Sequence, residues 1–528
     1  MSSEDNQTLT PSIGLELEFL LFVKETGIET DIPTMFKSSR GKPISLPSNQ
    51  LEDEQAREFA VQLLIDATIA QVTSQHTGDR VVRSAAQLRD PNAWHLRRAR
   101  TWVVDKDGSV SLPPELASDP VIAQYTCMPV EINSPALFAT DSSYAETHAV
   151  VKALRDEYWL FCPPTSGLHV HYGNGENYIP FHSLRRIGAF LFVADPVLVQ
   201  LHPAHRRDNQ YCRSNRNYSE IAHGKSATAA ARESGTQEKE EAIEPFPATV
   251  SPSSVSPFEN QWVFQRGELG GNIFNPTEFA RGQPAEQLRI PGADTTQPVP
   301  LLRAFDELFK SVNAPTTAYL LNGPERLAYS FVAYLVTRYR VGPQMPPHAG
   351  SSSSGSTTES SSHEETSSSS SDSNAAGALS AQNNQPKRTI EFRQAAGSIE
   401  PDQVVAWAQV VVGLCMFAST ANLRRLAHIA VDCAEAEIDA TWYDVFDLLE
   451  EVGLTDQGKV LQNGIATSRQ NYTPVRRIRF SAPAPPAMFS PITQPRSRTP
   501  FARPDDEMFL VRLLRSLTSY FSLLPSRN

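Results

Sequence analysis

The chain has 528 residues, with 59 acidic and 47 basic side chains and a formal net charge of −12. This acidic balance argues against nucleic-acid binding through a generic basic surface. No continuous run of about 18 apolar residues is present, so we expect no membrane-spanning helix and no integral membrane association. The five cysteines are scattered along the chain. That distribution argues against a disulfide framework and favours a reducing, cytoplasmic setting.

Helical periodicity appears in six stretches of the chain. They are 52–73, 144–160, 182–201, 402–421, 441–452 and 505–524. In the first stretch, the apolar residues Ala60, Leu63, Leu64, Ala67 and Ile69 fall near one face of the predicted helix. The last stretch forms an amphipathic C-terminal segment.

Short strands are predicted between these helices. They cover 13–23, 101–105, 128–133, 167–173 and 389–394. Long helices combined with strands that show no regular βαβ alternation predict an α+β fold with a mostly antiparallel sheet.

Three polar stretches interrupt the ordered pattern. We expect flexible insertions at about 226–257 and 343–387, the second of which contains a serine run at 351–373. Such a composition offers little apolar surface to offset the entropy of ordering. A Pro-, Arg- and Ser-rich linker is predicted at 473–504. The remaining chain divides into one domain at 11–472 and the C-terminal helix at 505–528.

Four of the predicted strands share an unusual pattern, in which ionisable or amide side chains stand two residues apart. Side chains at i and i+2 of a strand share one face, and the apolar residues between them share the other. The pairs are Glu16 with Glu18, Glu131 with Asn133, His169 with His171, and Glu391 with Arg393.

If these strands belong to one sheet, one of its surfaces gathers several carboxylates. Clustered carboxylates repel one another and raise one another's pKa unless a cation compensates. A glutamate-rich site with one or two histidines suits Mg²⁺ or Mn²⁺ better than zinc. Mg²⁺ held by few carboxylates commonly binds the phosphates of a nucleotide as well. For any single strand the alternative is an ordinary half-exposed strand.

At these residues the sequence resembles the amidoligases of the carboxylate–amine ligase superfamily, which is related to glutamine synthetase and glutamate–cysteine ligase. The matching segments, in chain order, are GLELEF at 14–19, VEINSP at 130–135, SGLHVH at 166–171 and TIEFRQ at 389–394. The segment AGSIEP at 396–401 and Trp407 also match. The resemblance covers about 11–450, without the two insertions.

The resemblance implies a curved, mostly antiparallel sheet, with helices on its convex face and a concave face that binds ATP and Mg²⁺ or Mn²⁺. It implies an enzyme that activates a small-molecule carboxylate as an acyl phosphate, which an amine or ammonia then converts to an amide. Carried over to this chain, the implied metal ligands are Glu16, Glu18, Glu131, His169 and Glu391. Glu391 and Arg393 would be catalytic, and His169 and His171 would contact the nucleotide.

A basic loop at 202–207 follows the third predicted helix. We expect Arg207 of this loop to bind the cofactor at the rim of the site, although a solvated loop fits the pattern equally well. Two other functions remain open at this point. One is a metal-dependent hydrolase that uses His169 and His171. The other is a catalytically inactive scaffold that keeps the ligase fold.

Overall fold

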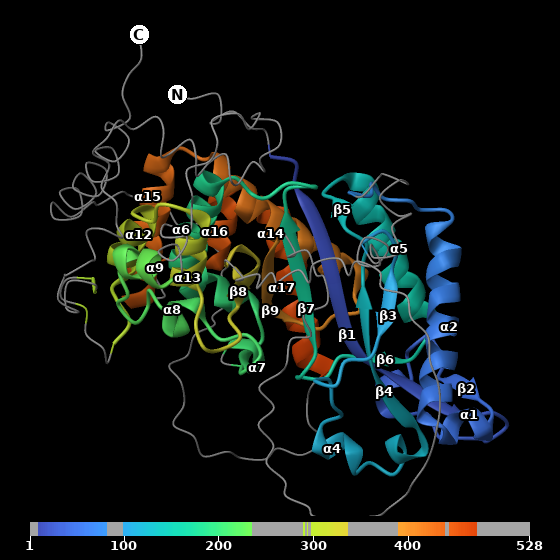
Figure 1. Cartoon of the computed structure of the whole chain (residues 1–528). Helices are drawn as coiled ribbons and strands as arrows, with labels where there is room; N and C mark the ends of the chain where they lie inside the picture. The colour runs from blue at the N-terminus through green and yellow to red at the C-terminus, as the bar shows by residue number, and fades with distance from the viewer. Residues whose placement is uncertain are drawn as a thin grey trace, which may run out of the picture.

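The computed structural model describes residues 9–81, 99–207, 209–234, 297–335, 389–438 and 443–471, together with residues 289, 290 and 293. Over these residues the fold is α+β, as predicted, with a nine-stranded sheet flanked by helices (Figure 1). The strands are β1 Ser12–Glu25, β2 Ile44–Leu46, β3 Val103–Asp105, β4 Thr126–Asn133, β5 Leu137–Phe138, β6 Leu160–Phe161, β7 Gly167–Gly173, β8 Tyr329–Ser330 and β9 Ile390–Ala396.

The sheet is built around β1. Its main path runs β3-β4-β1-β7-β9-β8, and the short strands β2, β5 and β6 also pair with β1. All pairings are antiparallel except that of β1 with β2. The five predicted strands are all present, and four of them, β1, β4, β7 and β9, carry the paired polar side chains.

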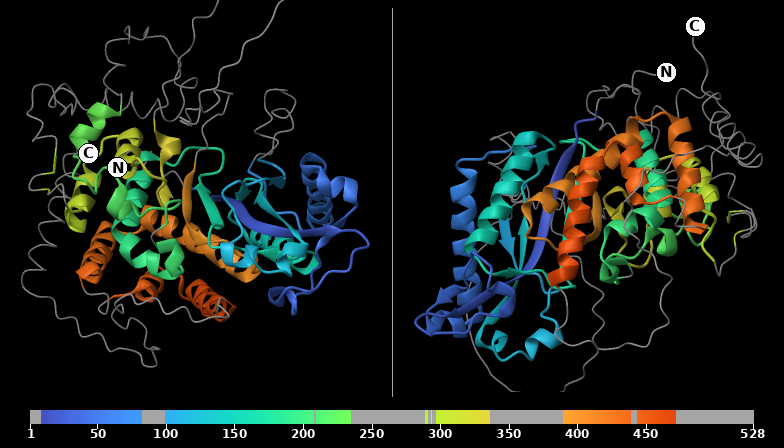
Figure 2. Two further views of the ribbon diagram at one scale, coloured as in Figure 1. Left: turned by 90° about the horizontal axis from the view of Figure 1, so that it is seen from below. Right: turned by 180° about the vertical axis from the view of Figure 1, so that it is seen from behind.

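The helices lie beside and behind the sheet. Those of more than seven residues are α2 Glu54–Thr73, α5 Asp141–Glu157, α6 Phe181–Leu198, α12 Leu301–Phe309, α13 Ala314–Leu321, α14 Pro401–Thr420, α15 Leu423–Ile438 and α17 Thr455–Asn471. The shorter ones are α1 Ser48–Glu52, α4 Pro114–Ala117, α7 Ala204–Arg207, α8 Asn215–Tyr218, α9 Ala227–Glu233 and α16 Val445–Glu451. Seen from behind, α5 and α14 cross the sheet, and α2 lies beyond α5 (Figure 2).

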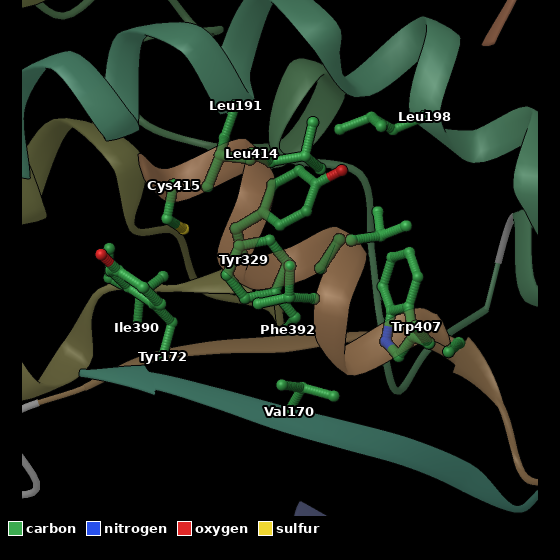
Figure 3. Close-up of a cluster of buried hydrophobic side chains, with 14 of the residues drawn as sticks. Val170, Tyr172, Leu191, Leu198, Tyr329, Ile390, Phe392, Trp407, Leu414 and Cys415 are labelled. Atoms are coloured by element: carbon green, nitrogen blue, oxygen red, sulfur yellow. The ribbon is translucent and has the colours of Figure 1, made fainter. Parts of the chain in front are cut away.

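The apolar face of the sheet meets these helices in one continuous core. Val170 and Tyr172 of β7 and Ile390 and Phe392 of β9 point from the sheet toward α14 and α6 (Figure 3). Each of these four side chains is fully buried. The opposite face of the same strands is thereby left for the polar side chains.

Strand β9 departs from strict alternation at one point. Its register with β7 shifts between Leu168 and Val170, because β9 holds one more residue than β7 in that interval. Gln394 is turned into the helical layer, where its amide donates to the buried carboxylate of Asp195 and accepts from the Tyr329 hydroxyl. A bulge of this kind re-aims neighbouring side chains. Here it separates Arg393, on the polar face, from the buried Gln394.

The predicted buried face of the first long helix is wrong in detail. The residues of α2 that pack into the core are Val61, Ile65 and Ile69. Leu63 and Leu64 are 52% and 41% exposed. Apolar residues occur on more than one side of this helix, so periodicity alone did not decide which stripe faces the sheet.

The first predicted insertion begins later than expected. Residues 227–233 form helix α9, whose first turn is capped by the Ser226 side chain accepting from the Ala229 amide. All four of its alanines, Ala227, Ala229, Ala230 and Ala231, are buried. The rest of that insertion, the serine run at 351–373, the linker at 473–504 and the C-terminal segment at 505–528 lie outside the described residues.

Helix α14 is long and apolar enough to cross a membrane by length and composition alone. In this structure it packs against β1, β7, α5, α6 and α17, so that Val404, Trp407 and Leu414 are buried within the protein. It begins at Pro401, a residue well suited to the first turn of a helix.

The core position of Phe392 predicts a large effect of truncation. Phe392→Ala should lower the free energy of unfolding by about 3–5 kcal/mol, because it removes a fully buried ring and leaves a cavity. Phe59→Ala on α2 is the matched control, since that ring is 62% exposed. Urea unfolding of both variants measures the difference. Similar losses in the two variants would contradict this assignment of the core.

Candidate functional site

The polar face of the sheet gathers the side chains that the alternation singled out. In an antiparallel pair, directly opposed residues point to the same face. Glu16 is opposite Asn133 on β4 and His169 on β7, and Glu18 is opposite Glu131. His171 is opposite Glu391 on β9. The structure therefore brings together Glu16, Glu18, Glu131, His169, His171, Glu391 and Arg393, as expected from the sequence.

The first cluster consists of Glu16, His169 and Glu391. One ligand atom from each lies within 4.8 Å of the others. The Nδ1 atom of His169 is 3.0 Å from a Glu16 oxygen and 3.8 Å from a Glu391 oxygen. Two carboxylates and one imidazole nitrogen aimed at one point form a donor set that suits a divalent cation.

A second cluster consists of Glu18, Asp107 and Glu131, again with ligand atoms within 4.8 Å of one another. Asp107 follows strand β3, and its two oxygens accept from the amide and the hydroxyl of Ser109 at 2.7 and 2.9 Å. This aspartate was not predicted from the sequence, because Asp107-Gly108 is typical of an ordinary turn and carries no strand alternation. The only sequence signal was its position two residues after a predicted strand.

Burial acts strongly on Glu18. It raises the pKa of this carboxyl from 4.5 to about 7, against the opposing effects of the nearby His169 and of the Gly167 amide. That amide donates to Glu18 Oε2 at 2.7 Å. The pKa of Glu131 is raised too, first by burial and then by the charge of Glu16. Both carboxyls thus lie where additional positive charge would stabilise their ionised forms.

A cavity of about 300 Å³ opens over these residues. Its lining holds the carboxylates of Glu16, Glu18, Asp107 and Glu131 and the arginines Arg206, Arg326 and Arg393. His169, Tyr211, Ser109 and Thr165 complete it. The cavity can therefore hold cations at its carboxylates and an anion at its arginines.

Arg393 contacts both a carboxylate of the first cluster and a second arginine of the cavity, Arg206. Its guanidinium lies 2.7 Å from a carboxylate oxygen of Glu391 in the first cluster. Its backbone carbonyl accepts from Arg206 at 2.6 Å, and the Arg206 Nε donates to the next carbonyl, that of Gln394. Arg206 is 1% exposed and is held in place by these two bonds. Its charge therefore has a fixed position beside the acidic side chains.

Arg207 donates from its Nε to the carbonyl of His202, and the neighbouring Arg206 lines the cavity. Consecutive residues of a helix point about 100° apart, so the two arginines on α7 face different directions. The expected contact of Arg207 with a cofactor at the rim of the site stays a prediction.

His171 supports the first cluster from the side. Its Nε2 lies 2.8 Å from Glu16 Oε1, and its Nδ1 lies 3.2 Å from the Thr389 hydroxyl. Among the described residues that line the cavity, His169 is present and His171 is not. Through its contact with Glu16, His171 can orient this carboxylate within the first cluster.

Comparison with known proteins gives one finding. Residues 10–248 match the family described as "putative amidoligase enzyme". The match favours an enzyme of the ligase type. It covers Glu16, Glu18, Asp107, Glu131, His169 and Arg206 but ends before Glu391, which belongs to the first cluster, and before Arg393, which lines the cavity. No curated protein and no solved structure matches significantly.

The raised pKa of Glu18 predicts a pH-dependent stability in metal-free protein. Because the folded state holds this proton more tightly than the unfolded state, stability falls as the pH rises from about 4.5 to about 7. The loss from this group should be on the order of 3 kcal/mol, since its side chain is only 5% exposed. Glu18→Gln should remove this part of the pH dependence.

Urea unfolding in the presence of a chelator at pH 4.5 and pH 8 measures this effect. The control variant is Glu115→Gln, at an exposed glutamate on α4. If Glu18→Gln changes the free energy of unfolding by the same amount at both pH values, the burial effect on this carboxyl is contradicted.

Proposed function

We propose that this protein is an ATP-dependent carboxylate–amine ligase with a glutamine-synthetase-like catalytic domain. The observation that carries the proposal is the pair of carboxylate clusters placed beside fixed arginines in one cavity. Ligation of a carboxylate needs both features, because polyanionic phosphates and an anionic acid must be brought together. The ligase-type family match at 10–248 supports the same function.

The residues present fit divalent metal ions. Most donor atoms in both clusters are carboxylate oxygens, which Mg²⁺ and Mn²⁺ prefer as ligands. Burial raises the pKa of Glu18 and of Glu131, so a bound cation would stabilise their ionised forms. We assign one ion to Glu16, His169 and Glu391 and a second to Glu18, Asp107 and Glu131. When bound, these ions would neutralise charge on the phosphates of ATP and on the transferred phosphoryl group.

The proposed reaction has two steps. A carboxylate oxygen of the acid attacks the γ-phosphorus of ATP, which gives an acyl phosphate and ADP. The amine nitrogen then attacks the carbonyl carbon, the phosphate leaves with the bonding electrons, and the nitrogen loses a proton. Through both steps negative charge lies on phosphoryl oxygens, which makes electrostatic stabilisation and positioning the main contribution of the protein.

The chain's own groups divide this work. Arg393 lines the cavity and pairs with Glu391 of the first cluster. From this position its guanidinium can bind phosphoryl oxygens or the reacting carboxylate. Glu391 belongs to the first cluster and also holds Arg393 in place through their ion pair. His171 orients Glu16. Arg206 supplies a buried positive charge that needs no reorganisation during the reaction.

A hydrolase that uses two histidine ligands has less support. Both His169 and His171 lie against Glu16, and only His169 lines the cavity among the described residues.

The direct test of the proposed ligase activity is incubation of the purified protein with ATP, Mg²⁺ and pools of amino acids and amines. A ligase releases phosphate only when an acid and an amine are both present, whereas phosphate release that ignores the amine would refute the proposal.

Metal and nucleotide should raise the stability of the protein together. Mg²⁺ that binds only the folded state should add about 2.7 kcal/mol at a hundredfold excess over its Kd. ATP should add more only when metal is present. Glu16→Gln should raise metal-free stability by relieving its repulsion with Glu131. Glu16→Gln and Glu391→Gln should each remove the part of the metal response that comes from the first cluster and leave the part that comes from the second. His169→Ala should weaken the first part without raising metal-free stability.

Thermal melts with and without Mg²⁺ and ATP separate these outcomes. Glu115→Gln again serves as the control, and its metal response should equal that of the wild type. No shift at millimolar Mg²⁺ or Mn²⁺ would refute the metal assignment and would favour a catalytically inactive scaffold.

The second cluster can be tested on its own through Asp107. Asp107→Asn should leave one of the two ions bound, because it removes a carboxylate from the second cluster and none from the first. Titration of Mn²⁺ followed by electron paramagnetic resonance should show two bound ions in the wild type and one in the variant. Two ions bound with unchanged affinity would exclude Asp107 as a ligand.

A further inference from the structure

A buried carboxylate lies behind the site, on the helical side of β9. Asp195 of α6 is 1% exposed, and its Oδ2 accepts from the Ser214 hydroxyl at 2.5 Å and from the Arg216 amide at 2.9 Å. Its Oδ1 accepts from Nε2 of Gln394 at 2.9 Å. Burial raises the pKa of this carboxyl against the opposing effect of these donors. Because burial of a carboxylate is unfavourable by itself, its place here depends on what these hydrogen bonds hold together.

Gln394 uses both ends of its side-chain amide. Its Nε2 donates to Asp195, and its Oε1 accepts from the Tyr329 hydroxyl at 2.8 Å. Gln394 is only 2% exposed. Turning this side chain out of the helical layer would therefore break two buried hydrogen bonds and leave their partners unsatisfied. These bonds fix the direction of the residue that directly follows Arg393.

The bulge of β9 makes that direction decisive. In the bulge, Arg393 and Gln394 stand opposite the single residue His169 of β7. The flanking residues Phe392 and Ala395 are both buried in the core. Strand alternation between two inward residues leaves room for one outward residue, so one member of the bulged pair must turn inward. The hydrogen bonds of Gln394 decide that Arg393 is the one that faces the cavity.

Arg206 holds the same two residues by their backbone. Its guanidinium donates to the carbonyl of Arg393 at 2.6 Å and to that of Gln394 at 3.3 Å. On the opposite edge of the strand, the Arg393 amide donates to the Ala328 carbonyl at 2.8 Å. The backbone of the bulge is thus fixed on both sides, and the direction of its two side chains is set by the partners of Gln394.

The partners of Gln394 belong to one hydrogen-bonded unit. The side-chain amide of Asn215 donates to the Tyr329 carbonyl at 2.9 Å, and its oxygen accepts from the Tyr329 amide at 2.8 Å. Asp195 binds the residues on both sides of Asn215. The carboxylate and the Tyr329 residue therefore keep a fixed relative position, and Gln394 meets an acceptor and a donor that are both held in place.

We propose that Asp195 and Gln394 are positioning residues for Arg393. By fixing the bulge of β9 from the helical side, they direct the Arg393 guanidinium into the cavity, where it pairs with Glu391. Among the described residues that line the cavity, neither Asp195 nor Gln394 is present, so both act through Arg393. The role of Arg393 in the reaction rests on the proposed ligase function, whereas its direction follows from the hydrogen bonds.

The experiment exchanges the roles of the two partners in the full chain. Gln394→Glu places two carboxylates against each other at pH 8. It should lower the rate of amine-dependent phosphate release by about tenfold to a hundredfold, the loss expected for a displacement of about 1 Å. Adding Asp195→Asn restores a donor opposite the new carboxylate and keeps the acceptor for Ser214 and Arg216. This double variant should recover to within about threefold of the wild-type rate, because the two positions are coupled.

Two further variants separate positioning from stability. Gln394→Met removes both hydrogen bonds without adding charge and should lower the rate by a similar factor. The control is Glu146→Gln on α5, at a second fully buried carboxylate, whose donors include Arg80 and Trp102. It should lose stability yet keep the wild-type rate per folded molecule, and thermal melts give the folded fraction. Rate losses that merely follow the loss of folded protein, or a double variant no faster than Gln394→Glu, contradict the inference.

Crystal structures of the wild type and the variants, grown without ligands, test the inference independently of the proposed function. Arg393 should leave Glu391 in Gln394→Met and keep this ion pair in the double variant of Asp195→Asn with Gln394→Glu. An unchanged position of Arg393 in Gln394→Met overturns the inference even if the enzyme is an active ligase. If the wild type shows no amine-dependent phosphate release, the proposed function fails, and a displaced Arg393 in Gln394→Met still supports the positioning role.

Discussion

Strand β1 hydrogen-bonds to β4 on one side and to β7 on the other, and this double register places Glu16, Glu18 and Glu131 on one face. Glu16 meets His169 across one pair, and Glu18 meets Glu131 across the other. A slip of one residue on either side would turn these side chains into the apolar core. The buried residues Leu15, Leu17 and Phe19 prevent that slip, since they would then face the cavity.

The cavity brings together side chains of both charges. Four carboxylates and three arginines line it, and Arg393 forms an ion pair with Glu391 of the first cluster. Burial raises the pKa of Glu18 despite the nearby positive groups, so an added cation would stabilise its ionised form. A cation and a small anion bound side by side would complete both sets at once, which is the arrangement that phosphoryl transfer to an acid requires.

The strand part of this site could be predicted from the sequence, and the loop part could not. Alternation with period two located the pairs at Glu16, Glu131, His169 and Glu391, because strand geometry converts spacing directly into a shared face. Asp107 and Arg326 lie in loops, where spacing carries no such information. Helical segments gave a weaker signal: the arginine of α7 that lines the cavity is Arg206, next to the Arg207 singled out from the sequence, and the face of α2 that packs into the core is that of Val61, Ile65 and Ile69.

The position of β9 in the chain has a consequence for how the protein is made. Glu391 stands 375 positions after Glu16, its partner in the first cluster (391 − 16). At about 5–20 residues per second, the ribosome needs roughly 20–75 seconds to synthesise that interval. In the later part of this time, from the end of β7 at Gly173 to the start of β9 at Ile390, β7 has no neighbour on its outer side, and its free backbone groups form an exposed strand edge. The nascent chain therefore passes through an aggregation-prone stage that ends only when one of the last described strands arrives.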